Sequence, residues 1–133
     1  MWQALRDELH TQGFELVTVG LDTLGADGCR MFMEAAEPTH PALIDQYHVL
    51  ARTLGVINIP SAVWIDENGQ IVRPAEPAPS PQPRARDAAP QLPPDTPDRI
   101  VGMMTEAAKI TSDSETYHAA LRDWVSNGSD SPY

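Results

Sequence analysis

Cysteine is nearly absent from this sequence: among its 133 residues, Cys29 carries the one thiol. A disulfide within the chain and a Cys-x-x-Cys redox centre both need two cysteines, so both are excluded. A zinc site built on thiolates is excluded for the same reason. The four histidines do not replace the missing thiols, because no two of them have the spacing of HxxxH or HExxH. We therefore expect no metal and no cofactor.

Positive charge is also scarce. Nine basic residues face 19 acidic ones, which gives a formal net charge of −10. Such a chain would be repelled by a phosphate backbone or an anionic membrane surface, so we expect no nucleic-acid partner. Long apolar runs are missing too, and no segment approaches the roughly 18 residues of a membrane helix. The opening MWQALRDELH lacks the pattern of a signal peptide, which by itself predicts a cytoplasmic chain.

Proline is abundant but unevenly placed: nine of the 13 prolines fall between Pro74 and Pro97. This tract has few large apolar side chains, so we predict that residues 75–95 form no helix or strand and act as an extended spacer. A proline-rich ligand for an aromatic groove is the functional alternative. The domain prediction is an α/β domain at 1–74, a linker at 75–96, a helical tail at 97–128 and a disordered end at 129–133.

The first 75 residues alternate between helix and strand patterns, which is typical of an α/β fold. Asp45 has the character of an N-cap, and Gly13 and Gly55 are natural helix ends. The segment Asn68-Gly69 is a strong hairpin signal, so a parallel sheet should end in an antiparallel hairpin. The expected elements are helices at 2–12, 30–36 and 45–54 and strands at 14–21, 42–44, 61–65 and 70–73.

The tail carries two helix patterns. Thr96 and Pro97 predict the start of the first, and Ser112 with Glu115 forms a capping box at the start of the second. The apolar stripe of the second helix consists of Tyr117, Leu121 and Trp124. We expect a helical hairpin whose stripes pack on each other or back on the sheet.

A proline at the entrance to an internal strand is unusual, because proline cannot donate to a ladder. Pro60 stands at this position. A cis Ile59–Pro60 bond and a trans proline at the first strand position both fit the spacing.

The run GVINIPSAVWIDENGQIVRP resembles the cis-proline loop and terminal hairpin of thioredoxin-like thiol–disulfide oxidoreductases, in the branch of cytochrome-maturation proteins and peroxiredoxin-like redoxins. The resemblance covers roughly residues 2–75. It implies a partial thioredoxin-like fold with a mixed sheet, a cis Ile59–Pro60 bond, and a peptide or protein partner bound at Ile59 and Pro60 by strand addition. The matching residues are Gly55, Val56, Pro60, Ile65, Asp66, Gly69 and Ile71.

The sequence departs from this family at the dithiol. The family carries Cys-x-x-Cys at the start of its first helix, whereas this sequence begins inside the matching helix and has no such pair. We therefore expect a redoxin domain, a fragment without redox activity of its own, or alternatively a non-catalytic peptide-binding module on the same scaffold. A Cys or selenocysteine pair encoded upstream and a true loss of redox chemistry both remain open. The compartment also stays open, because the resemblance points outside the cytoplasm.

Cys29 is the candidate catalytic thiol. It is expected on a Gly-rich loop beside Arg30, where a neighbouring cation would favour a reactive thiolate. An isolated thiol without a role is the simpler interpretation. The strand that should flank 14–21 is missing from the pattern, which leaves an unpaired edge. We expect a homodimer or poor solubility unless the stripe of Tyr117, Leu121 and Trp124 covers that edge.

Overall fold

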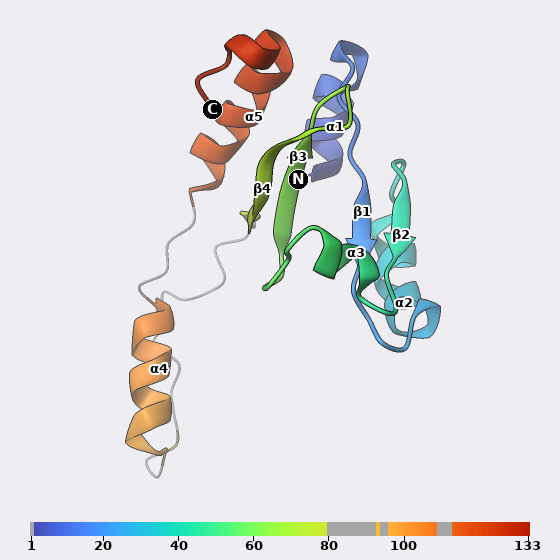
Figure 1. Cartoon of the computed structure of the whole chain (residues 1–133). Coiled ribbons are helices and arrows are strands. Elements are labelled where there is room, and N and C mark those ends of the chain that lie inside the picture. The colour runs from blue at the N-terminus through green and yellow to red at the C-terminus, as the bar shows by residue number, and fades with distance from the viewer. Residues whose placement is uncertain (1, 80–92, 94–95, 109–112) are drawn as a thin grey trace.

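The computed structural model describes residues 2–79, 93, 96–108 and 113–133. These residues form a mixed α/β structure with two small sheets (Figure 1). The elements are α1 (Trp2–Leu9), η1 (His10–Gln12), β1 (Thr18–Gly20), α2 (Ala26–Ala36), β2 (Ala42–Ile44), α3 (Val49–Thr53), β3 (Ser61–Ile65), β4 (Ile71–Pro77), α4 (Asp98–Ala108), α5 (Ser114–Asn127) and η2 (Gly128–Asp130).

The strands pair in two separate sheets. β1 and β2 are parallel, with Thr18 opposite Ala42, and β3 and β4 are antiparallel. The parallel pair and the terminal hairpin confirm the α/β prediction. The prediction of one mixed sheet is wrong for the described residues, because no ladder joins β1 to β3. In Figure 1 the two sheets lie next to each other without pairing.

β1 is much shorter than the predicted strand at 14–21. A strand extends only as far as its partner, and β2 is confined between Pro41 and Asp45. The carbonyl of Pro41 accepts from the amide of Thr18 at 3.0 Å, and the amide of Asp45 donates to the carbonyl of Gly20 at 2.9 Å. These two bonds mark the ends of the ladder, so residues 14–17 lie outside it.

The predicted helices are present, but some begin or end at other residues than predicted. α1 and η1 together fill the predicted 2–12, and Gly13 ends them with a φ of 91°. α2 begins at Ala26 and so includes Cys29, whereas the sequence predicts a loop at this residue. α3 is only five residues long, because residues 45–48 form a turn. The N-cap residue of α3 is His48 and not the predicted Asp45, although the carboxylate of Asp45 accepts from the amides of Val49 at 2.8 Å and Ala51 at 3.0 Å.

β4 continues to Pro77, so the prediction that residues 75–95 contain no strand is wrong at its start. Proline is tolerated at an edge strand when its nitrogen faces away from the partner. The amide of Ala78 donates to the carbonyl of Pro60 at 3.0 Å, so the preceding nitrogen, that of Pro77, faces outward. Most of the predicted linker, residues 80–92 and 94–95, lies outside the described residues.

The core is an aromatic cluster that joins the two ends of the chain. α5 lies beside the β3–β4 hairpin (Figure 1), and the guanidinium of Arg122 on α5 bonds the carboxylate of Glu8 on α1 twice, at 2.7 and 2.8 Å. The second tail helix, α5, therefore packs back on the domain, one of the two outcomes expected for the tail. α4 stands apart from α5 in Figure 1, so the predicted helical hairpin does not form. The cluster contains Leu5, Leu9, Trp64, Ala120 and Leu121, surrounded by Trp2, Phe14, Tyr117, Trp124 and Val125.

The helix starts in the tail differ from the prediction. Asp113 caps α5, accepting from the amide of Thr116 at 2.9 Å, while Ser112 lies outside the described residues. α4 begins at Asp98, and the carbonyl of Pro97 accepts its first bond from Ile100 at 2.8 Å. Residues 129–133, expected to be disordered, include part of η2. The hydroxyl of Ser131 there donates to the carboxylate of Asp123 at 2.8 Å.

Candidate functional site

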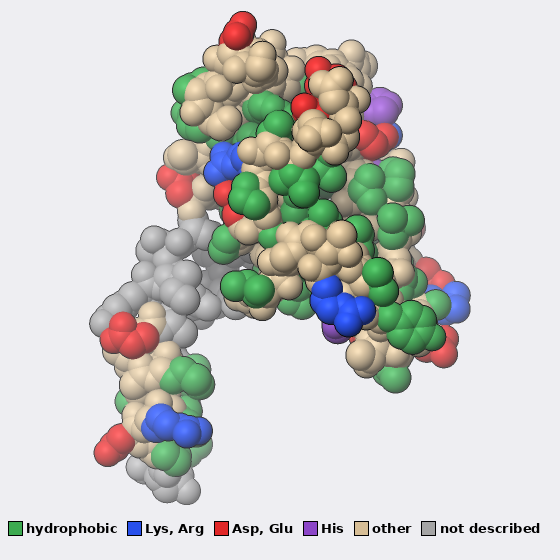
Figure 2. Space-filling view, in the orientation of Figure 1, with side chains coloured by type: hydrophobic (Ala, Val, Ile, Leu, Met, Phe, Trp, Pro, Cys, Tyr) green, Lys and Arg blue, Asp and Glu red, His purple; other side chains and the backbone are tan. Residues whose placement is uncertain are grey.

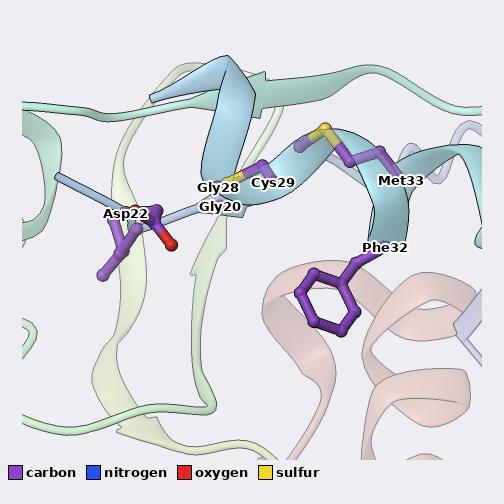
Figure 3. Close-up of a pocket in the computed structure, with 7 residues that line it drawn as sticks. Gly20, Asp22, Gly28, Cys29, Phe32 and Met33 are labelled. Carbon is purple, nitrogen blue, oxygen red and sulfur yellow. The ribbon is translucent and has the colours of Figure 1, made fainter. Parts of the chain in front are cut away.

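Cys29 lies on α2 and is buried, with 7% of its surface exposed. It points toward the end of β1, where Figure 3 shows a hollow between the strand and the helix. The hollow has a volume of about 260 Å³. It is lined by Gly20, Leu21, Asp22, Gly28, Cys29, Phe32 and Met33.

Two glycines bring the walls of this hollow together. A Cβ at Gly20 would lie 2.8 Å from the Cys29 sulfur, and a Cβ at Gly28 would collide with the carboxylate of Asp22. That carboxylate also accepts from the amide of Leu24 at 2.8 Å, which fixes the turn into α2. The close approach therefore packs helix against strand, and the thiol fills the contact.

Little positive charge lies beside the thiol among the residues that line the hollow. Arg30, the next residue along the helix, turns toward Asp27, 4.0 Å away between Nη2 and Oδ1. The lining of the hollow contains no histidine, lysine or arginine. Reactive cysteines are typically partly exposed in an electropositive environment, whereas Cys29 is buried and no basic side chain lines its hollow.

The second predicted site is the loop from Gly55 to Pro60. The Ile59–Pro60 bond is cis, so that alternative of the two is confirmed. The side-chain oxygen of Asn58 accepts from the amide of Ile59 at 2.9 Å, and its carbonyl accepts from the hydroxyl of Ser61 at 2.5 Å. The carbonyl of Pro60 is held by Ala78. The loop is thus fixed at both sides of the proline.

The apolar side chains of this loop face solvent. Ile57 is 99% exposed and Ile59 is 64% exposed. The structure brings Ile59 and Pro60 together at the entrance of β3, but Cys29 belongs to another place: the hollow beside it includes neither loop residue. The predicted site residues therefore form two separate sites.

A third arrangement was missed from the sequence. The indole of Trp64 donates to the hydroxyl of Tyr117 at 2.7 Å, and the guanidinium of Arg73 stacks 4.5 Å from the Trp64 ring. Arg73 also pairs with Glu76 at 2.8 Å. Burial raises the pKa of Tyr117 to about 12, so the phenol stays protonated. Arg73 and Glu76 are three residues apart, a spacing that is compatible with an ion pair, but the domain prediction places Glu76 in the linker.

The part of the chain that is described also bears on metal binding and on membrane insertion. There, no three His, Cys, Asp or Glu side chains lie in a group able to hold a metal ion. None of its helices is long and apolar enough to cross a membrane. No protein-family model, no curated protein and no solved structure shows a significant match to this chain.

Proposed function

We propose that this chain is a thioredoxin-like redoxin domain that has no thiol–disulfide exchange activity of its own. The supporting observation is the run from Gly55 to Ile71, which contains a helix end, an exposed loop, β3, a tight turn and the start of β4. The family resemblance implies this same order. The carboxylate of Asp66 builds the turn, accepting from the amides of Asn68 at 3.0 Å and Gln70 at 2.7 Å.

The lack of activity rests on Cys29. Thiol–disulfide exchange requires an attacking thiolate with access to its target, and a second thiol to resolve the mixed disulfide. The chain offers one thiol, packed between α2 and β1. Its role is therefore structural.

Insulin reduction driven by dithiothreitol tests this proposal. The chain should give the rate of the protein-free control, and Cys29→Ser should give the same rate. A faster rate that Cys29→Ser abolishes would show that the thiol is catalytic and would refute the proposal.

Binding of an extended peptide at the Ile59–Pro60 loop is the second candidate function. The favouring observation is the pair of exposed isoleucines, Ile57 and Ile59, on a loop that its own hydrogen bonds hold in place. An isoleucine buried by a ligand contributes about 1.5–3 kcal/mol, or at least tenfold in affinity.

Fluorescence anisotropy with labelled, carboxymethylated α-lactalbumin, a permanently unfolded chain, tests the loop. Ile59→Asp should weaken binding about tenfold. Ile71→Asp is the matched control, because Ile71 is a similarly exposed isoleucine on β4. Equal effects of the two changes would exclude the loop as the binding site.

A further inference from the structure

The β1–β2 sheet leaves one edge of β1 unpaired. In a parallel ladder, alternate residues turn their peptide groups to the partner strand. Thr18 and Gly20 bond to the β2 side, through Pro41 and Asp45. The N–H and C=O of Val19, which lies between them, therefore point to the opposite edge.

β3 has a free edge of the same kind. The carbonyl of Pro60 and the amide of Asp66 both bond toward β4, and Ala62 is paired with Glu76. The register shifts on either side of Trp64 place the extra residues in β4, so β3 keeps its alternation and the peptide groups of Ser61 and Val63 point away from β4. Among the described residues, no backbone hydrogen bond reaches the outward groups of Val19 or Val63.

These two free edges are the inner edges of the two sheets as Figure 1 shows them. Across the molecule in Figure 1 the strands follow the order β4, β3, β1, β2, so the free sides of β3 and β1 are the inner ones. β1 and β3 run in opposite directions there. One extended segment between them would satisfy peptide groups on both strands and join two marginal sheets into one.

The side chains at the ends of these edges define the chemistry of that segment. Exposed apolar side chains stand at both ends: Val17 and Ile65 at one, Ile59 at the other. Carboxylates also stand at both ends, because Asp22 follows β1 while Asp66 and Glu67 follow β3. Backbone hydrogen bonds lower the pKa of Asp66 and keep it ionised.

We infer that the free edges of β1 and β3 together bind one extended segment of another polypeptide. The segment is apolar over about five residues, the usual length of a strand, and carries lysine or arginine at both ends. A second copy of this chain, the homodimer that the unpaired edge also predicts, is the less favoured occupant, because each copy carries a charge of −10. The inference goes beyond the loop proposed above, since it places the ligand on the peptide groups of Val19 and Val63.

A labelled peptide, KKVTVIVKK, tests the inference by fluorescence anisotropy. Successive residues of a strand turn their amides to opposite sides. N-methylation of every second amide of the peptide therefore blocks its pairing with β1 or with β3. N-methylation of the remaining amides blocks its pairing with the other of these two strands. We expect micromolar binding of the parent peptide and at least a tenfold loss for each methylated form.

Amide hydrogen exchange locates the bound peptide. Saturation with KKVTVIVKK should slow exchange at both Val19 and Val63. Val19→Pro and Val63→Pro remove the outward N–H groups and should each weaken binding at least tenfold. Val19→Thr and Val63→Thr keep the amide and the branched side chain, and should bind like the parent.

Several outcomes would overturn the inference. In the first the parent peptide does not bind, and in the second only one of the two methylated forms loses binding. The third outcome is a dimer, seen by sedimentation, in which hydrogen exchange at the Val19 amide is slow without any peptide. Ile59→Asp separates the two proposals. If it abolishes peptide binding while both proline variants bind normally, the loop proposal stands and the edge inference fails.

Discussion

The two sides of this molecule differ in how many apolar side chains they bury. On one side, α1, the β3–β4 hairpin and α5 enclose the aromatic cluster around Trp64, which is 4% exposed. On the other side, α2, α3, β1 and β2 hold only Cys29 and Ala51 as buried apolar residues. Figure 2 shows hydrophobic side chains on the surface there. Those more than half exposed are Leu24, Met31, Phe32, Leu43, Tyr47 and Val49.

The difference shows what makes the first side stable. Its contacts join residues far apart in the chain, as when Arg122 binds Glu8, and large aromatic rings bury much surface each. A two-stranded sheet covered on one face by short helices buries too little to be stable alone. The aromatic side should therefore set the stability of the whole chain, and the parallel side should depend on a ligand.

The largest expected effect comes from Trp64. Trp64→Ala removes the central ring and the bond to Tyr117, and should lower the free energy of unfolding by about 3–5 kcal/mol. Leu43→Ala on β2 is the control and should cost less than about 1 kcal/mol, because Leu43 is half exposed. Urea denaturation followed by circular dichroism measures both. Equal losses would show that the two sides are equally packed.

Amide hydrogen exchange compares the two sides without mutation. Amides of β3 bonded to β4 should exchange at least about tenfold more slowly than those of β1 bonded to β2, because local opening needs less free energy where little surface is buried. Similar protection of both sheets would contradict the comparison.

Arg73→Met tests how the hairpin holds α5. The change keeps much of the apolar stem but removes the cation over Trp64 and leaves Glu76 without its partner. We expect a loss of about 1–2 kcal/mol, given that both side chains are partly exposed. Arg52→Met, on α3, is a matched control expected to change little. No difference between the two variants would exclude a role for the Arg73 stack.

The smallest effect concerns Glu15, which lies between the two sides. Its hydrogen bond to Arg6 lowers its pKa from about 4.5 to about 2. A depressed carboxyl pKa adds stability above pH 4.5, and this is lost as the pH falls toward 2. Glu15→Gln should therefore flatten the acid dependence over that window. A carboxyl NMR titration with a midpoint near 4.5 would contradict this.

The sequence predicted local features well. The end of α1 at Gly13, the turn at Asn68-Gly69 and the helix stripe of Tyr117, Leu121 and Trp124 follow from residues close in the chain. The length of β1 could not be predicted, since it depends on β2. The arrangement of Arg73, Glu76 and Trp64 could not be predicted either. The proline content predicts that the domain ends at residue 74, whereas β4 continues to Pro77.

The three tryptophans of the chain, Trp2, Trp64 and Trp124, all belong to the aromatic cluster. Tryptophan fluorescence therefore reports on one side of the protein and not on the other. If the parallel side opens first, the emission spectrum will stay unchanged while far-ultraviolet dichroism falls. Phe32→Trp, on α2, would add a tryptophan signal that reports on the side formed by α2, α3, β1 and β2.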